Sequence, residues 1–228
     1  MSNKIKIGLM GFGRVGRNIF RLGYNDPNLN FVAISDLGQP ETLEYLLVRD
    51  SVHGPLGVDA DIKNNYLNVA NQSVRLLPGG RPSDIPWDLI DVDVVIDTTG
   101  VSWPEEEFEA YRAFSKQTII TNPDMSFVDR IVVPGVNESD ISLDDRIISP
   151  SSSTTQVLAL MLKILDAEFG VKNAMMATVH AYTSDQPLAD NTQVNRRRSR
   201  SAVENIIPNE TPSTRLVEAL FPHLEGKV

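Results

Sequence analysis

The chain has 228 residues and a formal net charge of −9, with 41% hydrophobic and 22% charged residues, an ordinary composition for one large globular domain or two modest ones. The negative charge argues against a nucleic-acid partner, because its phosphates would be repelled. No apolar run reaches the roughly 18 residues that a membrane span needs, and the lack of cysteine excludes disulfides, thiolate metal sites and thiol nucleophiles.

Short apolar runs alternate with amphipathic segments through the first two thirds of the chain. Helices are predicted at 14–24 and 41–48, where apolar residues recur with helical spacing. Buried parallel strands are predicted at 5–10, 31–35, 92–96, 118–121, 131–133 and 146–148. This strand–helix alternation predicts a doubly wound sheet with helices on both faces.

The pattern changes after Ser149, where a second domain begins. A polar run at 151–156 precedes a predicted helix at 157–168, and a strand is predicted at 174–180. A further helix is predicted at 214–220. The three histidines are scattered along the chain, so we expect no metal site. The N-terminus enters the first strand without a signal-peptide layout, and we therefore expect a cytoplasmic protein.

A glycine-rich turn joins the first predicted strand to the first predicted helix, as in dinucleotide-binding proteins. Glycines at these spacings allow a tight turn and a close backbone approach to a pyrophosphate, and the helix N-terminus attracts the phosphates. The predicted cofactor residues here are Gly11, Phe12, Gly13, Arg14, Val15 and Gly16.

Asp36 ends the second predicted strand, where the dinucleotide pattern requires an acid. Its carboxylate can accept hydrogen bonds from ribose hydroxyls and would repel a 2′-phosphate, so we predict NAD rather than NADP. The alternative is a glycine turn that only joins a strand to a helix. We favour NAD because the strand, the glycines, the helix and the acid all occur in the required order.

The segment Lys6–Arg17, KIGLMGFGRVGR, resembles the start of the glyceraldehyde-3-phosphate dehydrogenase family. Further matching landmarks follow in order along the chain, at 45–47, 50–54, 85–87, 97–101, 135–137, 178–183 and 206–208. The resemblance implies a tetrameric enzyme that oxidises a phosphorylated aldehyde with NAD and captures inorganic phosphate as an acyl phosphate. It adds Thr99 and Gly100 to the predicted cofactor residues. Asp185–Gln186 and the Leu-Phe-Pro step at 220–222 resemble the erythrose-4-phosphate dehydrogenase branch.

The family's catalytic cysteine is replaced in this chain. The segment at 149–156 reads SPSSSTTQ, and Ser153 stands where the family has the nucleophile. The resemblance assigns His180 as the base, although the end of an apolar strand could equally hold a buried structural histidine. A serine hydroxyl ionises far less readily than a thiol with its free pKa of about 8.5, so we expect catalysis to be impaired. Differences beyond position 153 favour natural divergence over an engineered substitution.

The resemblance also implies an anion-binding set for inorganic phosphate or the substrate phosphate. Hydroxyl groups and a guanidinium are suitable donors for a tetrahedral anion. The residues are Ser152, Thr154, Thr183, Arg198 and Thr211. The arginine cluster at 196–200 resembles the family's S-loop, which serves anion binding and subunit contacts, so it predicts a homo-oligomer rather than RNA binding.

We therefore expect an α/β protein in two parts. A Rossmann-type doubly wound NAD-binding domain is predicted at 1–150, followed at 151–228 by the incomplete start of an α+β catalytic domain of the glyceraldehyde-3-phosphate dehydrogenase type. The family's later strands have no counterpart before Val228, so we expect further chain or a partner to cover the unfinished sheet.

Three functions remain open from the sequence. The first is an NAD-binding family member with impaired catalysis. The second is an active phosphorylating aldehyde dehydrogenase, acting on glyceraldehyde 3-phosphate or erythrose 4-phosphate, represented by a fragment or a mutant. The third is a non-enzymatic interaction or regulatory protein on a Rossmann scaffold.

Overall fold

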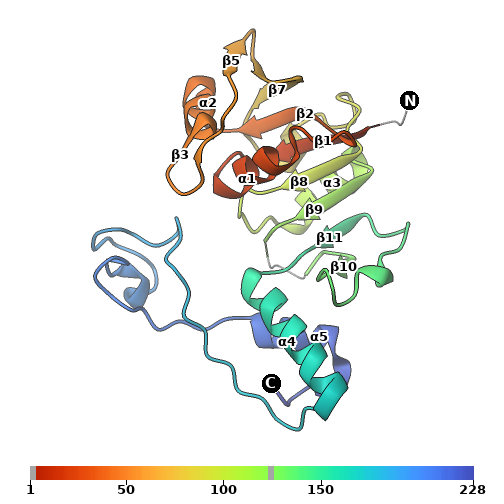
Figure 1. Ribbon diagram of the computed structural model, residues 1–228, viewed down its shortest axis with the longest axis vertical. Helices are drawn as coiled ribbons and strands as arrows, with labels where there is room; N and C mark the ends of the chain where they lie inside the picture. Colours follow the sequence, from red (N-terminus) through yellow and green to blue (C-terminus); the bar gives the residue numbers. More distant parts are fainter. Residues whose placement is uncertain (1–3, 123–125) are drawn as a thin grey trace. The chain divides into compact units, whose positions relative to one another are not determined.

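The computed structural model describes residues 4–122 and 126–228 (Figure 1). The chain divides into an N-terminal unit, Met1–Ser152, and a C-terminal unit, Ser153–Val228. Among the described residues, no helix is long and apolar enough to cross a membrane.

A nine-stranded sheet forms the centre of the described N-terminal unit, in the order β10-β11-β9-β8-β1-β2-β7-β6-β5. The strands are β1 (Ile5–Met10), β2 (Leu29–Asp36), β5 (Ala60–Lys63), β6 (Tyr66–Val69), β7 (Gln72–Pro78), β8 (Val94–Asp97), β9 (Gln117–Ile120), β10 (Arg130–Ile131) and β11 (Ile147–Ser149). Neighbours from β10 to β7 are parallel, and the β7-β6-β5 edge is antiparallel. β1 lies between β2 and β8, so the strand order reverses there, which is where ligands bind in open α/β sheets.

Helices cover both faces of this sheet because successive strand side chains point to opposite sides. On one face, Leu9 packs in a core with residues of α1 (Arg14–Gly23) and α2 (Pro40–Val48). On the other face, Met10 packs in a core with residues of α3 (Glu105–Phe114). The shorter elements of this unit are η1 (Pro82–Asp84), η2 (Glu138–Asp140) and the antiparallel pair β3 (Arg49–Asp50) and β4 (Gly54–Pro55).

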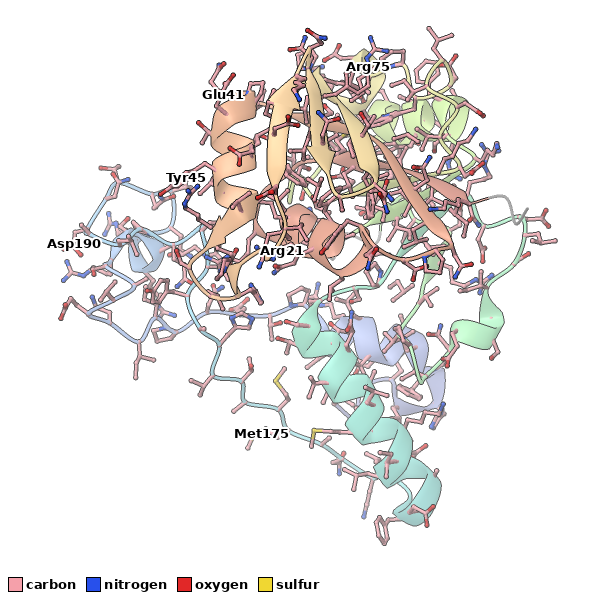
Figure 2. All side chains as sticks on the ribbon, turned by 45° about the horizontal axis from the view of Figure 1, so that its top comes forward. Arg21, Glu41, Tyr45, Arg75, Met175 and Asp190 are labelled. Atoms are coloured by element: carbon pink, nitrogen blue, oxygen red, sulfur yellow. The ribbon has the colours of Figure 1, made fainter. Side chains whose placement is uncertain are left out.

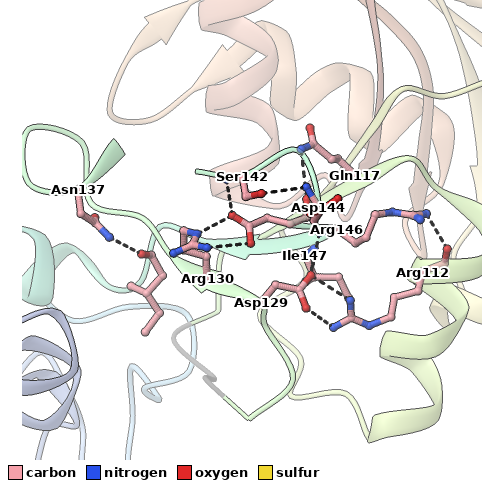
Figure 3. A network of polar contacts seen from close by, with 11 residues as sticks. Arg112, Gln117, Asp129, Arg130, Asn137, Ser142, Asp144, Arg146 and Ile147 are labelled. Atoms are coloured by element: carbon pink, nitrogen blue, oxygen red, sulfur yellow. Dashed lines mark hydrogen bonds and ion pairs between the residues drawn. The ribbon is translucent and has the colours of Figure 1, made fainter. Parts of the chain in front are cut away.

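Ion pairs fasten the β10–β11 edge to the rest of the sheet (Figure 3). Arg112 of α3 donates to both oxygens of Asp129, at 2.9 and 2.7 Å. Asp129 also accepts the backbone N–H groups of Arg146 and Ile147, each at 2.8 Å. Partial burial opposes ionisation of Asp129, but these hydrogen bonds prevail and lower its pKa. The carboxylate therefore links α3 to the start of β11, next to the edge strand β10.

The C-terminal unit is built on two packed helices, α4 (Ser153–Phe169) and α5 (Ser213–Leu220), with short turns η3 (Arg196–Ser199) and η4 (Pro222–Leu224) (Figure 1). Its buried apolar residues include Leu162 of α4 and Leu216 of α5. The opposite side of α4 exposes Val157, Met161 and Ile164. The long segment between α4 and α5 contains no regular strand in the described structure.

The predicted α/β fold class is confirmed, but individual elements differ. The strand predicted at 174–180 is wrong: this segment is extended without strand pairing, and Met175 and Val179 are each 97% exposed. An apolar run becomes a strand only when another strand satisfies its N–H and C=O groups, and the described residues provide none here. The helix predicted at 157–168 begins four residues earlier, at Ser153. Most other boundaries shift by one or two residues.

Candidate functional site

The glycine turn after β1 has the geometry of a dinucleotide-binding loop. Gly11 has a φ of 86°, which favours glycine. A Cβ on Gly16 would lie 2.3 Å from the carbonyl oxygen of Gly11, so only glycine allows this close helix–strand contact. A Cβ on Gly13 would meet nothing within 4 Å, because the backbone there faces open space. Turn, close packing and an open face therefore occur at the three positions where the motif requires them.

Asp36 ties the end of β2 to this turn. Its Oδ2 accepts the backbone N–H of Phe12 at 2.5 Å, and its Oδ1 accepts the backbone N–H of Gly38 at 2.7 Å. A carboxylate has about four lone-pair sites, so two remain for hydroxyl donors of a ligand. Asp36 thus holds the loop and can still accept ribose hydroxyls.

A groove of about 240 Å³ lies at the carboxyl ends of β1, β2 and β8. Its lining includes four of the predicted cofactor residues, Gly11, Gly13, Asp36 and Thr99. The others lie around it in different ways. Phe12 and Gly16 are buried, and Val15 is exposed. Arg14 lines a separate pocket. Gly100 follows β8 and has a φ of 72°.

Sequence analysis missed further residues that line this groove: Met10, Ser35, Leu37, Gly79, Gly80, Thr98, Val101 and Trp103. The Thr98 hydroxyl donates to the carbonyl of Gly11 at 2.7 Å and so fixes the glycine loop on β8. A Cβ on Gly79 would lie 2.5 Å from the backbone nitrogen of Leu37. Glycine at this position therefore allows the chain after β7 to approach the chain after β2 closely. The glycine pair after the alternating Val74–Leu76 segment was the available signal.

Asp97, buried at the end of β8, organises the side chains around the groove. One oxygen accepts from the backbone N–H and the hydroxyl of Thr99, at 2.8 and 2.7 Å. The other accepts from Trp103 Nε1 at 2.7 Å and from the Tyr111 hydroxyl at 2.8 Å. Burial and the nearby charge of Asp97 raise the pKa of Tyr111 well above its usual value, so the phenol remains a neutral donor. These contacts orient Thr99 and Trp103, which line the groove.

The two predicted catalytic residues line one cavity of about 440 Å³ in the C-terminal unit. Ser153 is the first residue of α4, where the helix dipole favours negative charge. His180 Nδ1 lies 2.6 Å from the carbonyl oxygen of Ala181. Because a carbonyl only accepts, Nδ1 carries the proton and Nε2 is the basic nitrogen. No hydrogen bond joins Ser153 to His180 within residues 4–122 and 126–228.

The five predicted phosphate-binding residues do not form one cluster. Thr183 and Arg198 lie close together because both contact the carboxylate of Asp185. The Thr183 hydroxyl donates to Oδ1, and Nη1 of Arg198 lies 3.1 Å from Oδ2. Thr154 lines the cavity of Ser153 and His180. Thr211 lies just before α5 and shares a 2.9 Å hydrogen bond with Ser213. Ser152 is the last residue of the N-terminal unit.

The N-terminal unit is thus a Rossmann-type nucleotide-binding domain, and the chain belongs to the class of two-part NAD-binding α/β proteins. Two family models match it: glyceraldehyde 3-phosphate dehydrogenase, NAD binding domain, over residues 5–104, and glyceraldehyde 3-phosphate dehydrogenase, C-terminal domain, over residues 152–228. The chain is a member of the glyceraldehyde-3-phosphate dehydrogenase family, and NAD is its cofactor.

Curated relatives agree with this assignment. The chain is 37% identical over 224 residues to glyceraldehyde-3-phosphate dehydrogenase 1 of Bacillus cereus, covering 98% of this chain and 67% of that protein. It is also 37% identical, over 226 residues in each case, to glyceraldehyde-3-phosphate dehydrogenase 1 of Bacillus subtilis and to the Geobacillus stearothermophilus enzyme, with the same two coverages. The chain therefore spans about two thirds of the length of these relatives.

Proposed function

We propose that this NAD-binding protein of the glyceraldehyde-3-phosphate dehydrogenase family is impaired in aldehyde oxidation because Ser153 stands in place of the nucleophilic cysteine. One observation carries the proposal. Ser153 begins α4 and shares a cavity with His180, while the chain contains no cysteine that could act instead. This shared cavity supports a family-type arrangement around position 153, with a hydroxyl in place of the thiol.

The cofactor groove fits the proposed ligand. Gly13 leaves room for a pyrophosphate at the N-terminus of α1, Asp36 retains acceptor sites for ribose hydroxyls, and Thr99 lies at the end of β8. NAD, when bound, supplies a hydride acceptor. The carboxylate of Asp36 would repel a 2′-phosphate, which supports NAD over NADP.

The nucleophilic step explains the proposed impairment. The Ser153 hydroxyl has to give its proton to Nε2 of His180 as its oxygen attacks the aldehyde carbon. The N-terminus of α4 stabilises the developing negative charge by about 0.3–1 kcal/mol, which is small beside the gap between a hydroxyl and a thiol. An oxygen ester is also cleaved by phosphate less readily than a thioester. Both acylation and phosphorolysis are therefore slowed.

We extend the proposal to ligands and assembly. The substrate class is a phosphorylated aldehyde, glyceraldehyde 3-phosphate or erythrose 4-phosphate, with inorganic phosphate as co-substrate for any turnover that survives. Ser152, Thr154, Thr183, Arg198 and Thr211 are the proposed anion-binding residues. At Thr183 and Arg198 an incoming anion must compete with Asp185. A homo-oligomer in the cytoplasm completes the proposal, supported by the S-loop-like arginine segment and the exposed apolar side of α4.

A fluorescence titration tests the cofactor half of the proposal. The chain has two tryptophans, of which Trp103 lines the groove and Trp87 is fully buried in the core. NAD should therefore quench the emission saturably, and Trp103→Phe should remove this response. A wild-type chain that also fails to bind NAD in calorimetry would instead support the interaction protein on a Rossmann scaffold.

Thiol reactivity tests the nucleophile half. Ser153→Cys should create the chain's only thiol, with a pKa below the free value of about 8.5 because His180 and the N-terminus of α4 favour the thiolate. Alkylation rate against pH should therefore show a lowered midpoint, and adding His180→Ala should raise it. Identical profiles centred near the free value would show that the pair is not assembled.

A further inference from the structure

A second concave site lies on the N-terminal unit, apart from the dinucleotide groove. It has a volume of about 130 Å³, about half that of the dinucleotide groove, and suits a small ion. The site is lined by Arg14, Arg17, Leu46, Arg49, Asp50, Ser51, Val52 and His53. These residues come from α1, from the end of α2, from β3 and from the turn between β3 and β4. We call it the arginine pocket.

The arginines of this pocket are not neutralised within the described part of the chain. Arg14, Arg17 and Arg49 form no ion pair there, although the charges of Asp50 and Asp36 act on Arg17 without a direct contact. Arg49 lies over the ring of Tyr45, with its guanidinium carbon 5.0 Å from the ring centre. Arg17 donates to the carbonyl of Phe12 at 2.9 Å, but its buried Nε has no hydrogen-bond partner in residues 4–122 and 126–228.

Asp50 is the one acid among the residues that line the pocket, and one of its two oxygens, Oδ1, already has three contacts. Its Oδ1 accepts the backbone N–H groups of Val52 and His53, each at 2.8 Å, and lies 3.1 Å from His53 Nδ1. These contacts, led by the backbone N–H of His53, lower the pKa of Asp50 to about 2. The pocket therefore has three guanidinium charges against one carboxylate, on a chain whose net charge is −9.

A fourth arginine, Arg21, connects the elements that form the pocket through hydrogen bonds. Arg21 donates from Nη1 to the carbonyl of Leu47 at 2.6 Å, and from Nη2 to those of Gly54 and Pro55 at 2.8 and 3.2 Å. It thus joins α1 to the end of α2 and to the β3–β4 pair. Figure 2 labels Arg21 and Tyr45, and shows Arg75, a residue of β7, well away from both.

We propose that the arginine pocket binds a tetrahedral phosphate dianion, as inorganic phosphate or as the terminal group of a phosphate monoester, separately from NAD. Guanidinium groups match phosphate oxygens in geometry and charge. An anion seated here accepts from Arg14 and Arg49 at the rim and satisfies the buried Nε of Arg17. Arg14 follows Gly13 of the dinucleotide groove directly, so the two anion sites are neighbours at the N-terminus of α1.

The test is a calorimetric titration with inorganic phosphate on the whole chain, saturated with NAD and held at constant ionic strength with chloride. The double variant Arg14→Gln/Arg49→Gln should weaken phosphate binding by about three- to tenfold, the range expected for losing exposed charge-assisted contacts. Arg75→Gln is the matched control, an exposed arginine of the same unit outside the pocket, and should bind as the wild type does. All three proteins carry Arg198→Gln as a common background, which weakens the proposed anion site of the C-terminal unit, so that the remaining phosphate binding reports on the arginine pocket.

A second variant keeps the arginines in place. Ser51→Asp puts a negative charge at the exposed rim and should weaken phosphate binding, whereas the uncharged Ser51→Asn should not. Glycerol phosphate in place of inorganic phosphate shows whether a monoester is accepted, and either ion binding through these residues supports the proposal. Equal phosphate affinity in the double variant and in Arg75→Gln would overturn it. So would a double variant that changes only the molecular mass in solution, since the pocket would then be a contact between copies.

Discussion

Two glycines of the dinucleotide loop should respond in opposite ways when each is replaced by alanine. At Gly16 the added methyl would lie 2.3 Å from the Gly11 carbonyl oxygen and 2.7 Å from the Thr98 hydroxyl oxygen. One of these groups has to retreat by roughly 1 Å before the contact becomes an ordinary van der Waals one. The Gly11 carbonyl also accepts the Thr98 hydroxyl at 2.7 Å, so its displacement strains the link between the loop and β8.

The expected cost of Gly16→Ala is about 1–3 kcal/mol, as for other overpacked sites. Alanine has a higher helix propensity than glycine by about 1 kcal/mol, so a net loss of stability would identify the steric contact as its cause. At Gly13 the added methyl meets nothing, and stability should change by less than about 0.5 kcal/mol. The methyl would instead occupy space in the groove, and we expect NAD affinity to fall about tenfold.

Urea unfolding followed by circular dichroism measures the first effect, and the Trp103 fluorescence titration measures the second. Gly16→Ala should lower the urea midpoint, while Gly13→Ala should keep the wild-type midpoint and lose NAD affinity. Wild-type stability in Gly16→Ala would refute the close contact between α1 and β1. Wild-type NAD affinity in Gly13→Ala would refute the placement of the pyrophosphate at this loop.

Three further predictions concern specificity, pH and assembly. Asp36→Ala should narrow the preference for NAD over NADP in calorimetry, and equal affinities in the wild type would contradict the role of Asp36. The pKa of Asp129 is lowered by folding, so its charged form stabilises the fold above about pH 4, and this stabilisation is lost as the pH falls further. Asp129→Asn should therefore reduce the free energy of unfolding in urea at neutral pH by about 1–3 kcal/mol. The variant's stability should also decline less steeply in acid than that of the wild type. Light scattering at micromolar concentration should show self-association, and a monomer that binds no hydrophobic dye would contradict it.

The parts of the fold that local patterns determine were predictable from the sequence. β1, α1 and β2 follow from a β-branched run, three glycines and a terminal acid within one short stretch. α3 was not predicted, although three glutamates follow Pro104 and suit the positive end of a helix. The β5-β6-β7 edge was also missed, although Asn64 and Asn65, with φ of 49° and 61°, form the two-residue turn of a hairpin.

What could not be predicted depends on contacts between distant residues. The role of Asp97 depends on Trp103 and Tyr111, which α3 and the loop before it bring to the end of β8. The arginine pocket combines α1 with the β3–β4 turn, and no local motif indicates that its guanidinium groups converge. The strand predicted at 174–180 failed for the same reason, since pairing depends on a second segment that the pattern itself does not contain.

Single-turnover NADH formation tests the central claim most directly. The wild-type chain is saturated with NAD, as shown by Trp103 fluorescence, and then mixed with glyceraldehyde 3-phosphate and, separately, with erythrose 4-phosphate, each with inorganic phosphate, while NADH absorbance is recorded. With Ser153 in place of the thiol and no cysteine in the chain, we predict saturable NAD binding and no burst of NADH. A burst stoichiometric with the bound NAD would contradict the account and show a competent dehydrogenase that uses Ser153 as its nucleophile.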